Sequence, residues 1–198
     1  HALYLSPMTI KTSASTTSYQ DMGEGPILIM LHGWGCDWQI FAPVIRGLSS
    51  TFRLIIPDLP AFGQSRITDD AIWDSFDYVV WLEEFISAVV TERDSFSLLG
   101  HSFGGKIAGL YAAQMQPQQL ERLILVDTSG LPVRLSTTQS LQSRVIQLIP
   151  KVMKDAVPLT LKAKVLGNIQ LSTDYLHSTK LQKMIFKKIV HEDISEYL

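Results

Sequence analysis

One serine of the sequence has the neighbours that nucleophilic chemistry needs. Residues 100–104 read Gly-His-Ser-Phe-Gly, so Ser102 stands between two glycines. An apolar run precedes this pentapeptide and a segment of small residues follows it, as when a serine sits on a sharp strand-to-helix turn. Gly100 and Gly104 leave the space that strand and helix need to approach each other there. The pattern predicts that Ser102 attacks a carbonyl carbon; the alternative is a glycine-rich turn with an incidental serine.

Attack on a carbonyl creates an oxyanion, and the sequence offers two backbone donors for it. The first is the amide of Phe103, directly after the nucleophile. The second is expected from the loop that follows the apolar run 27–31 and opens with His32 and Gly33; the amide of Trp34 is the best candidate. Both amides must be fixed before the reaction, because preorganised donors stabilise the developing charge.

Two histidines lie near these residues in the sequence, and neither is predicted to be the catalytic base. For His32 the favoured interpretation is a structural histidine that bonds loop carbonyls, because the expected oxyanion donors are backbone groups. His101 precedes Ser102 directly, but adjacent side chains on a tight turn point apart.

The strands and helices that must position these residues alternate along the chain. Residues 9–20 suggest a β-hairpin. Four apolar runs indicate buried strands, at residues 27–31, 53–56, 96–99 and 123–126. Helical spacing lies between them, at residues 38–48, 76–90 and 104–115. We expect an α/β fold with a mostly parallel sheet, helices on both faces and a ligand site at the carboxyl ends of the strands.

The pattern changes after Pro132. No buried-type strand follows, and breaks at Pro150, Pro158 and Gly167 separate several helices. We therefore expect two parts, a core over residues 1–132 and a helical cap over 133–198 whose apolar side chains close a pocket above the serine.

Composition excludes several classes of function. The 17 basic and 19 acidic residues of this 198-residue chain form no basic stripe, so no nucleic-acid partner is predicted. No apolar run reaches the roughly 18 residues of a membrane span. Cys36 is the single cysteine, which excludes an intramolecular disulfide and suits the cytoplasm. No metal or organic cofactor is implied.

Through these motifs, the chain resembles the α/β-hydrolase superfamily over nearly its whole length. The resemblance is closest to the branch of carboxylesterases, proline iminopeptidases and meta-cleavage hydrolases, which inserts a helical cap after the strand ending at Asp127. The motifs occur in the family's order at residues 31–35 (Leu-His-Gly-Trp-Gly), 57–65 (Pro-Asp-Leu-Pro-Ala-Phe-Gly-Gln-Ser), 100–105 (Gly-His-Ser-Phe-Gly-Gly) and 123–127 (Leu-Ile-Leu-Val-Asp). The resemblance implies a serine hydrolase that cleaves a small ester, amide or related acyl substrate.

The resemblance also implies parts that we do not expect within these 198 residues. In the family, the acid and the histidine follow Ser102 in chain order, each after one of two closing strands, and we expect both strands to be missing from this sequence. Asp127 is a candidate acid, or else a capping or loop-bonding aspartate; His177 and His191 are weak candidates for the base. We expect the chain alone to be inactive and to expose a strand edge, which a second fragment or a homodimer partner would complete. The alternative is a non-catalytic protein that binds ligands or dimerises on a truncated hydrolase fold.

Overall fold

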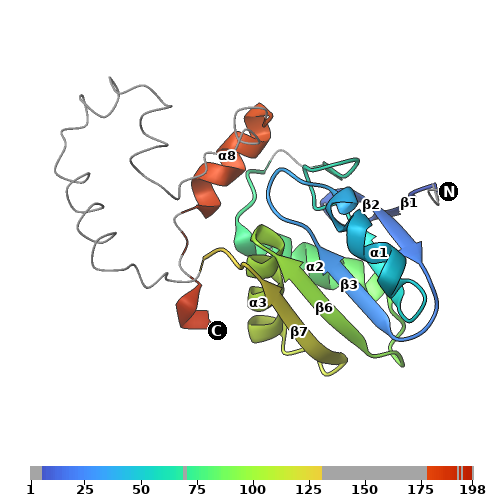
Figure 1. Cartoon of the computed structure of the whole chain (residues 1–198). Coiled ribbons are helices and arrows are strands. Elements are labelled where there is room, and N and C mark those ends of the chain that lie inside the picture. Colours follow the sequence, from blue (N-terminus) through green and yellow to red (C-terminus); the bar gives the residue numbers. More distant parts are fainter. Residues whose placement is uncertain (1–5, 69–70, 131–177, 191, 193, 198) are drawn as a thin grey trace, which may run out of the picture. The chain divides into compact units, whose positions relative to one another are not determined.

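The structure is a computed structural model (Figure 1), and it describes residues 6–68, 71–130, 178–190, 192 and 194–197. The chain divides into two compact units: His1–Leu131 with Thr179–Leu198 form the first, and Pro132–Ser178 form the second. Residues 179–198, which we expected to be part of the cap, therefore belong to the same compact unit as the core. The cap helices expected between 137 and 177 lie outside the described residues. Everything below concerns the first unit.

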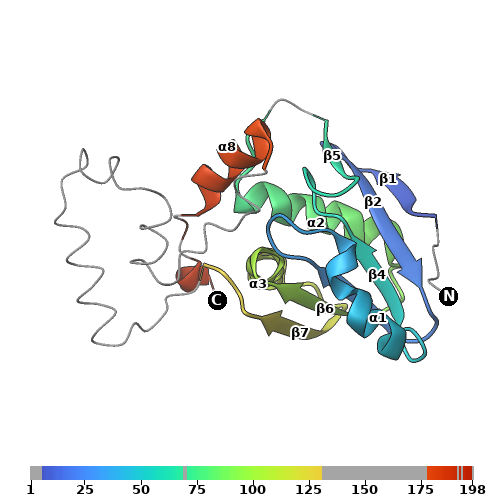
Figure 2. The same ribbon diagram turned by 45° about the horizontal axis from the view of Figure 1, so that its top comes forward.

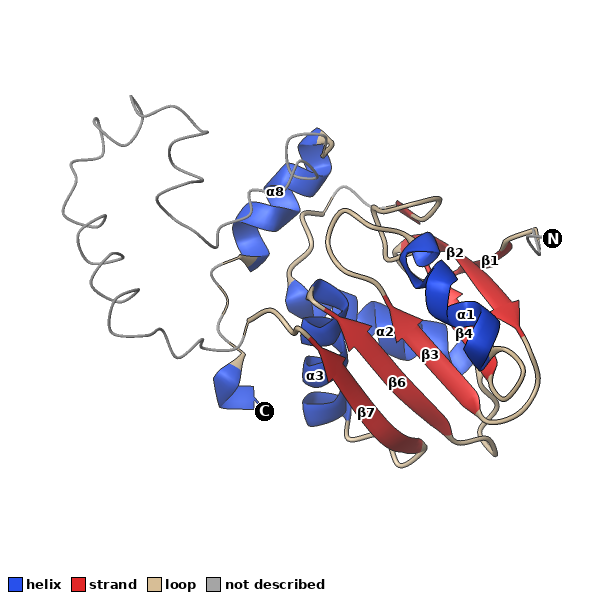
Figure 3. Ribbon diagram, viewed as in Figure 1, coloured by secondary structure: helices blue, strands red, loops and turns tan. Residues whose placement is uncertain are grey.

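A mixed sheet forms the middle of this unit. Its strands are β1 (Met8–Lys11), β2 (Ser15–Met22), β3 (Ile27–Leu31), β4 (Arg53–Pro57), β5 (Arg66–Ile67), β6 (Phe96–His101) and β7 (Leu120–Val126). The order is β1-β2-β4-β3-β6-β7, with β5 paired to β2. β1 and β2 form the expected antiparallel hairpin, and β4, β3, β6 and β7 are parallel neighbours. Their arrows run the same way in Figure 3, which brings their carboxyl ends to one edge.

Helices cover both faces of the sheet, as expected. The described helices are α1 (Ala42–Leu48), α2 (Ser75–Val89), α3 (Phe103–Met115) and α8 (Lys180–Ile189), with 3-10 turns at Trp38–Phe41 and Ser195–Tyr197; α1, α2 and α3 pack on the sheet. The expected helix over 38–48 begins as a 3-10 turn capped by Asp37, and the α-helix starts beside Pro43, which has no N–H to lose there. Figure 2 shows α1 on one side of the sheet and α2 and α3 on the other.

Strand β3 shows why the sheet holds together. All five of its residues are buried, and alternate side chains enter two separate cores. Ile29 packs with α2 and α3 residues on one face, whereas Leu28 and Met30 pack near Phe41 on the other. The continuous apolar run is thus a strand covered on both faces.

Strand β7 differs from this pattern. Leu123, Ile124, Leu125 and Val126 are between 36% and 43% exposed, because no described strand pairs with the outer side of β7. Among the described strands, β7 thus stands at one end of the sheet order, next to β6 alone. Within the described part of the chain, no helix is long and apolar enough to cross a membrane.

Candidate active site

Ser102 occupies a strained turn between β6 and α3. Its backbone has φ 51° and ψ −112°, a conformation that residues with a Cβ rarely adopt and that costs about 1–3 kcal/mol. Neighbouring backbone groups hold it: the Ser102 N–H donates to the Val126 carbonyl over 2.9 Å, and the Ser102 carbonyl accepts from Lys106 and Ser129 amides at 3.1 and 3.2 Å. The strain is therefore imposed by three elements that meet at one residue.

Two glycines make this turn sterically possible. A Cβ on Gly100 would lie 2.4 Å from the Gly104 carbonyl oxygen. A Cβ on Gly104 would lie 2.4 Å from the Leu31 carbonyl oxygen and 2.6 Å from that of His32. These atoms are backbone on rigid elements, so neither contact has room to relax. The close approach of strand and helix inferred from the sequence is present.

The loop after β3 lies beside the serine. A Cβ on Gly33 would come within 3.3 Å of the Ser102 Cβ. The Gly33 carbonyl accepts from His32 Nδ1 at 2.8 Å and from the Cys36 amide at 3.3 Å. Because a trans peptide group is planar, fixing this carbonyl also fixes the Trp34 N–H on the opposite side of the same group. Phe103 is the first residue of α3, where N–H groups have no partner inside the helix.

His32 is structural, and its hydrogen bonds define its tautomer. The Leu59 amide donates to His32 Nε2 over 2.9 Å, so the proton resides on Nδ1 and is donated to the Gly33 carbonyl. Burial of the ring lowers its pKa to about 4. The imidazole is therefore neutral at pH 7 and ties the loop after β3 to the loop after β4.

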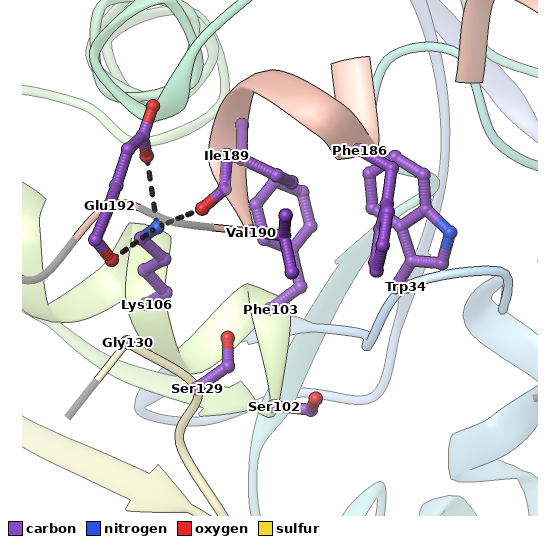
Figure 4. A pocket seen from close by; sticks show the side chains of 10 residues that line it. All are labelled: Trp34, Ser102, Phe103, Lys106, Ser129, Gly130, Phe186, Ile189, Val190 and Glu192. Atoms are coloured by element: carbon purple, nitrogen blue, oxygen red, sulfur yellow. Dashed lines mark hydrogen bonds and ion pairs between the residues drawn. The ribbon is translucent and has the colours of Figure 1, made fainter. Parts of the chain in front are cut away.

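An apolar pocket of about 150 Å³ opens beside Ser102. Five hydrophobic residues line it: Trp34 and Phe103 from the core, and Phe186, Ile189 and Val190 from α8 and its end. The Trp34 ring contacts Phe103 at 5.5 Å and Phe186 at 5.2 Å between centroids, both edge to face. Figure 4 shows Phe186 alongside Trp34, with Ser102 on the opposite side of the pocket from α8. The chain can therefore hold an apolar group next to the hydroxyl.

The remaining candidates stand apart from this geometry. Asp127 lies at the carboxyl end of β7 with φ 46°, is exposed, and makes no hydrogen bond to another described residue. His101 makes no hydrogen bond to Ser102, and its buried Nδ1 has no partner among the described atoms. His177 and His191 lie outside the described residues. In the described ranges, no three His, Cys, Asp or Glu residues gather as metal ligands.

Sequence reasoning missed the polar group that borders the pocket. Lys106 is buried in α3 and forms an ion pair with Glu192 at 2.9 Å. A single lysine among the small and apolar residues 103–111 was a usable signal, because a buried lysine needs a partner. Nothing local pointed to Glu192, which is 86 residues away.

Known proteins are similar to this chain over part of their length. Residues 26–163 match the family model of the alpha/beta hydrolase fold. A pimeloyl-[acyl-carrier protein] methyl ester esterase of Aeromonas hydrophila is 33% identical over 114 residues, which are 58% of this chain and 42% of that protein. A serine hydrolase-like protein of Danio rerio is 32% identical over 115 residues, 57% of this chain and 34% of that protein. The chain thus spans less than half the length of these two relatives.

The same fold is found among solved structures. The crystal structure of a membrane phospholipase A aligns with a TM-score of 0.71 and 21% identity, covering 98% of this chain and 66% of that one. At that identity the likeness concerns the fold alone. Since the family model covers well over half of the sequence, this chain belongs to the α/β-hydrolase fold family.

Proposed function

We propose that the full-length protein is a serine esterase for small acyl substrates, with Ser102 as its nucleophile. One observation carries the proposal: Ser102 is held in a strained turn at the mouth of an apolar pocket. Its backbone conformation lifts the side chain away from the strand and helix that flank it. Strain of this kind persists where the surrounding structure imposes it, and it is concentrated at functional sites.

The reaction would proceed by acyl transfer. The Ser102 Oγ attacks the ester carbonyl carbon as its proton passes to a base, and the carbonyl oxygen becomes an oxyanion. The N–H groups of Trp34 and Phe103 would donate to that oxygen. Collapse of the intermediate breaks the bond to the alcohol, which leaves with the proton. Water then releases the acid from the acyl-serine by the same route.

The base is the part of this mechanism that the described residues do not provide. Of the two histidines that the structure describes, His32 is held by Leu59 and Gly33, and the buried Nδ1 of His101 makes no hydrogen bond to Ser102. We propose that the full-length protein supplies the histidine. Asp127 remains a candidate acid because it follows β7 at the edge of the sheet that carries Ser102.

The substrate proposal rests on the pocket and on the relatives. Apolar cavities of this volume, about 150 Å³, hold a molecule the size of benzene, so a short acyl group fits. The similar protein of Aeromonas hydrophila is named as a methyl ester esterase. An ester of a short, uncharged acyl chain is therefore the substrate class that we propose, with amides as the related alternative.

Hydrolysis of p-nitrophenyl butyrate by the full-length protein tests this proposal. Ser102→Ala should reduce turnover by about 10⁴–10⁶-fold, as removal of a nucleophile does in serine hydrolases. Ser129→Ala is the matched control, because Ser129 lines the same pocket and is given no chemical role. Equal turnover by wild type and Ser102→Ala would overturn the proposal.

A further inference from the structure

Lys106 uses its whole ammonium group to hold the end of one helix. Its side chain is 3% exposed, and its Nζ donates to the Ile189 carbonyl at 2.8 Å, to the Glu192 carboxylate at 2.9 Å and to the Glu192 carbonyl at 3.3 Å. An ammonium has three donors, so all of them are satisfied. Every acceptor belongs to the C-terminal end of α8 or to the turn that follows it.

The chemistry of this contact explains why it is tight. A buried ammonium is costly unless it is paired and hydrogen-bonded. The last carbonyls of a helix have no partner inside it and carry partial negative charge, which favours a cation there. The Glu192 carboxylate neutralises Lys106 and also accepts a hydrogen bond from the Ser75 hydroxyl of α2. Figure 4 shows the Ile189 and Glu192 acceptors converging on Lys106 Nζ.

The same turn of α3 carries the nucleophile. The Lys106 amide donates to the Ser102 carbonyl, so the two residues are one helical turn apart. On the other side of the contact, Ile189 and Phe186 of α8 line the pocket beside Ser102. Lys106 therefore connects the nucleophile turn directly to the helix that forms the opposite wall of the pocket.

Other polar contacts also join α8 to the core. Lys188, next to Ile189, pairs with Asp74 at 3.1 Å and donates to the Ile72 carbonyl at 2.9 Å, but its side chain is 45% exposed, and exposed pairs contribute little. Gln182, near the start of the helix, donates to the Ala61 carbonyl at 2.7 Å. Lys106, by contrast, makes a buried charged contact with the end of α8 that carries Ile189.

We propose that Lys106 is a positioning residue: it anchors α8 as the wall of the acyl pocket and thereby sets the length of acyl chain that the site accepts. This rests on the proposed esterase function. When the anchor is removed, α8 shifts outward while the Ser102 turn, held by β7 and α3, stays in place. Recognition of the acyl group should suffer more than the chemistry.

The test uses full-length Lys106→Met and a series of p-nitrophenyl esters from acetate to octanoate. KM for butyrate should rise about tenfold while kcat changes less than about threefold, because ground-state binding is lost and the reaction centre is kept. The ratio of kcat/KM for octanoate to that for butyrate should rise about fivefold or more. Glu192→Gln keeps the backbone acceptors, so it should shift the ratio in the same direction by less.

Lys180→Met is the matched control, because Lys180 is an exposed lysine on the same helix. It should leave both the KM and the ratio unchanged. An unchanged octanoate-to-butyrate ratio in Lys106→Met would overturn the inference; if that variant does not fold, an unchanged ratio in Glu192→Gln would do so. Absence of ester turnover in the wild type would instead refute the proposed function itself.

Discussion

The Ser102 amide nitrogen donates to the carbonyl oxygen of Val126 over 2.9 Å, and this bond joins the nucleophile turn to the exposed strand β7. Val126 is 43% exposed, yet its backbone carbonyl holds the strained Ser102 turn. β7 therefore supports the site through its inner edge, where it pairs with β6, while its outer edge carries no described partner.

Ser102→Gly should be more stable than Ser102→Ala, although both are inactive. Alanine keeps the Cβ that makes φ 51° unfavourable, whereas glycine adopts that conformation freely. The difference in the free energy of unfolding should be about 1 kcal/mol, measured by urea denaturation of the two full-length variants. Equal stability would mean that the turn relaxes when the hydroxyl is lost.

Gly104→Ala should disrupt the elbow. The added Cβ would lie 2.4 and 2.6 Å from two backbone carbonyl oxygens, so β3 and α3 would have to move apart. We expect a loss of about 3 kcal/mol in the free energy of unfolding, at the upper end for overpacking, together with loss of ester turnover.

Gly47→Ala is the control for that change, since it adds the same methyl group to a helix. A Cβ on Gly47 meets no atom within 4 Å, and the residue lies inside α1. Its free energy of unfolding should rise by about 0.5–1 kcal/mol, because alanine is the better helix former. Similar effects of both changes would contradict the crowding at Gly104.

The neutral state of His32 should make stability depend on pH. Its pKa is about 4 in the folded protein, against an unperturbed 6.5, so the unfolded chain takes up the proton first as the pH falls. The contribution of His32 is fully present above pH 6.5 and is lost progressively down to about pH 4. The loss should reach about 3 kcal/mol, measured by urea denaturation at several pH values.

His32→Gln isolates this contribution, because it removes the titrating group and leaves the rest of the molecule. The comparison matters because burial raises the pKa of the nearby Asp58 carboxyl, which has the opposite effect on stability in acid. The free energy of unfolding of the wild type minus that of His32→Gln should therefore decrease between pH 6.5 and 4, free of the contribution of Asp58. A flat difference would indicate that the His32 ring is not held neutral.

Phe186→Ala should widen the pocket. The Phe186 ring contacts Trp34 and lines the pocket, so its removal leaves space for a longer acyl chain. The ratio of kcat/KM for p-nitrophenyl octanoate to that for butyrate should rise about tenfold. Met184→Ala, at an exposed position of the same helix, should leave the ratio unchanged. A lower ratio in Phe186→Ala would indicate that the acyl chain does not bind in the pocket lined by Phe186.

Much of the fold followed from local patterns. The apolar runs at 27–31 and 53–56 became β3 and β4, and the glycines around Ser102 predicted a turn whose close contacts the structure contains. These features depend on neighbours in the sequence, because periodicity and the absence of a Cβ act locally. β7 began three residues earlier than its apolar run, at Leu120.

The walls of the site could not be predicted in the same way. The sequence predicted helices in the region 133–198, but not the surface on which α8 lies. That surface depends on distant contacts, among them the bonds of Lys106 to Ile189 and Glu192, which are 83 and 86 residues away. We predicted that His32 would bond to groups of a loop. Its partner Leu59 could not be predicted, because it lies on another loop, far from His32 in the sequence.

Labelling of the full-length protein with a fluorophosphonate, followed by peptide mass spectrometry, tests directly whether Ser102 is the nucleophile. Such reagents form a bond to an activated serine as fluoride leaves, so we expect one adduct, on Ser102, that is lost in Ser102→Ala and kept in Ser129→Ala. An adduct on Ser129, or no adduct in a folded protein, would contradict the assignment of Ser102 as the nucleophile.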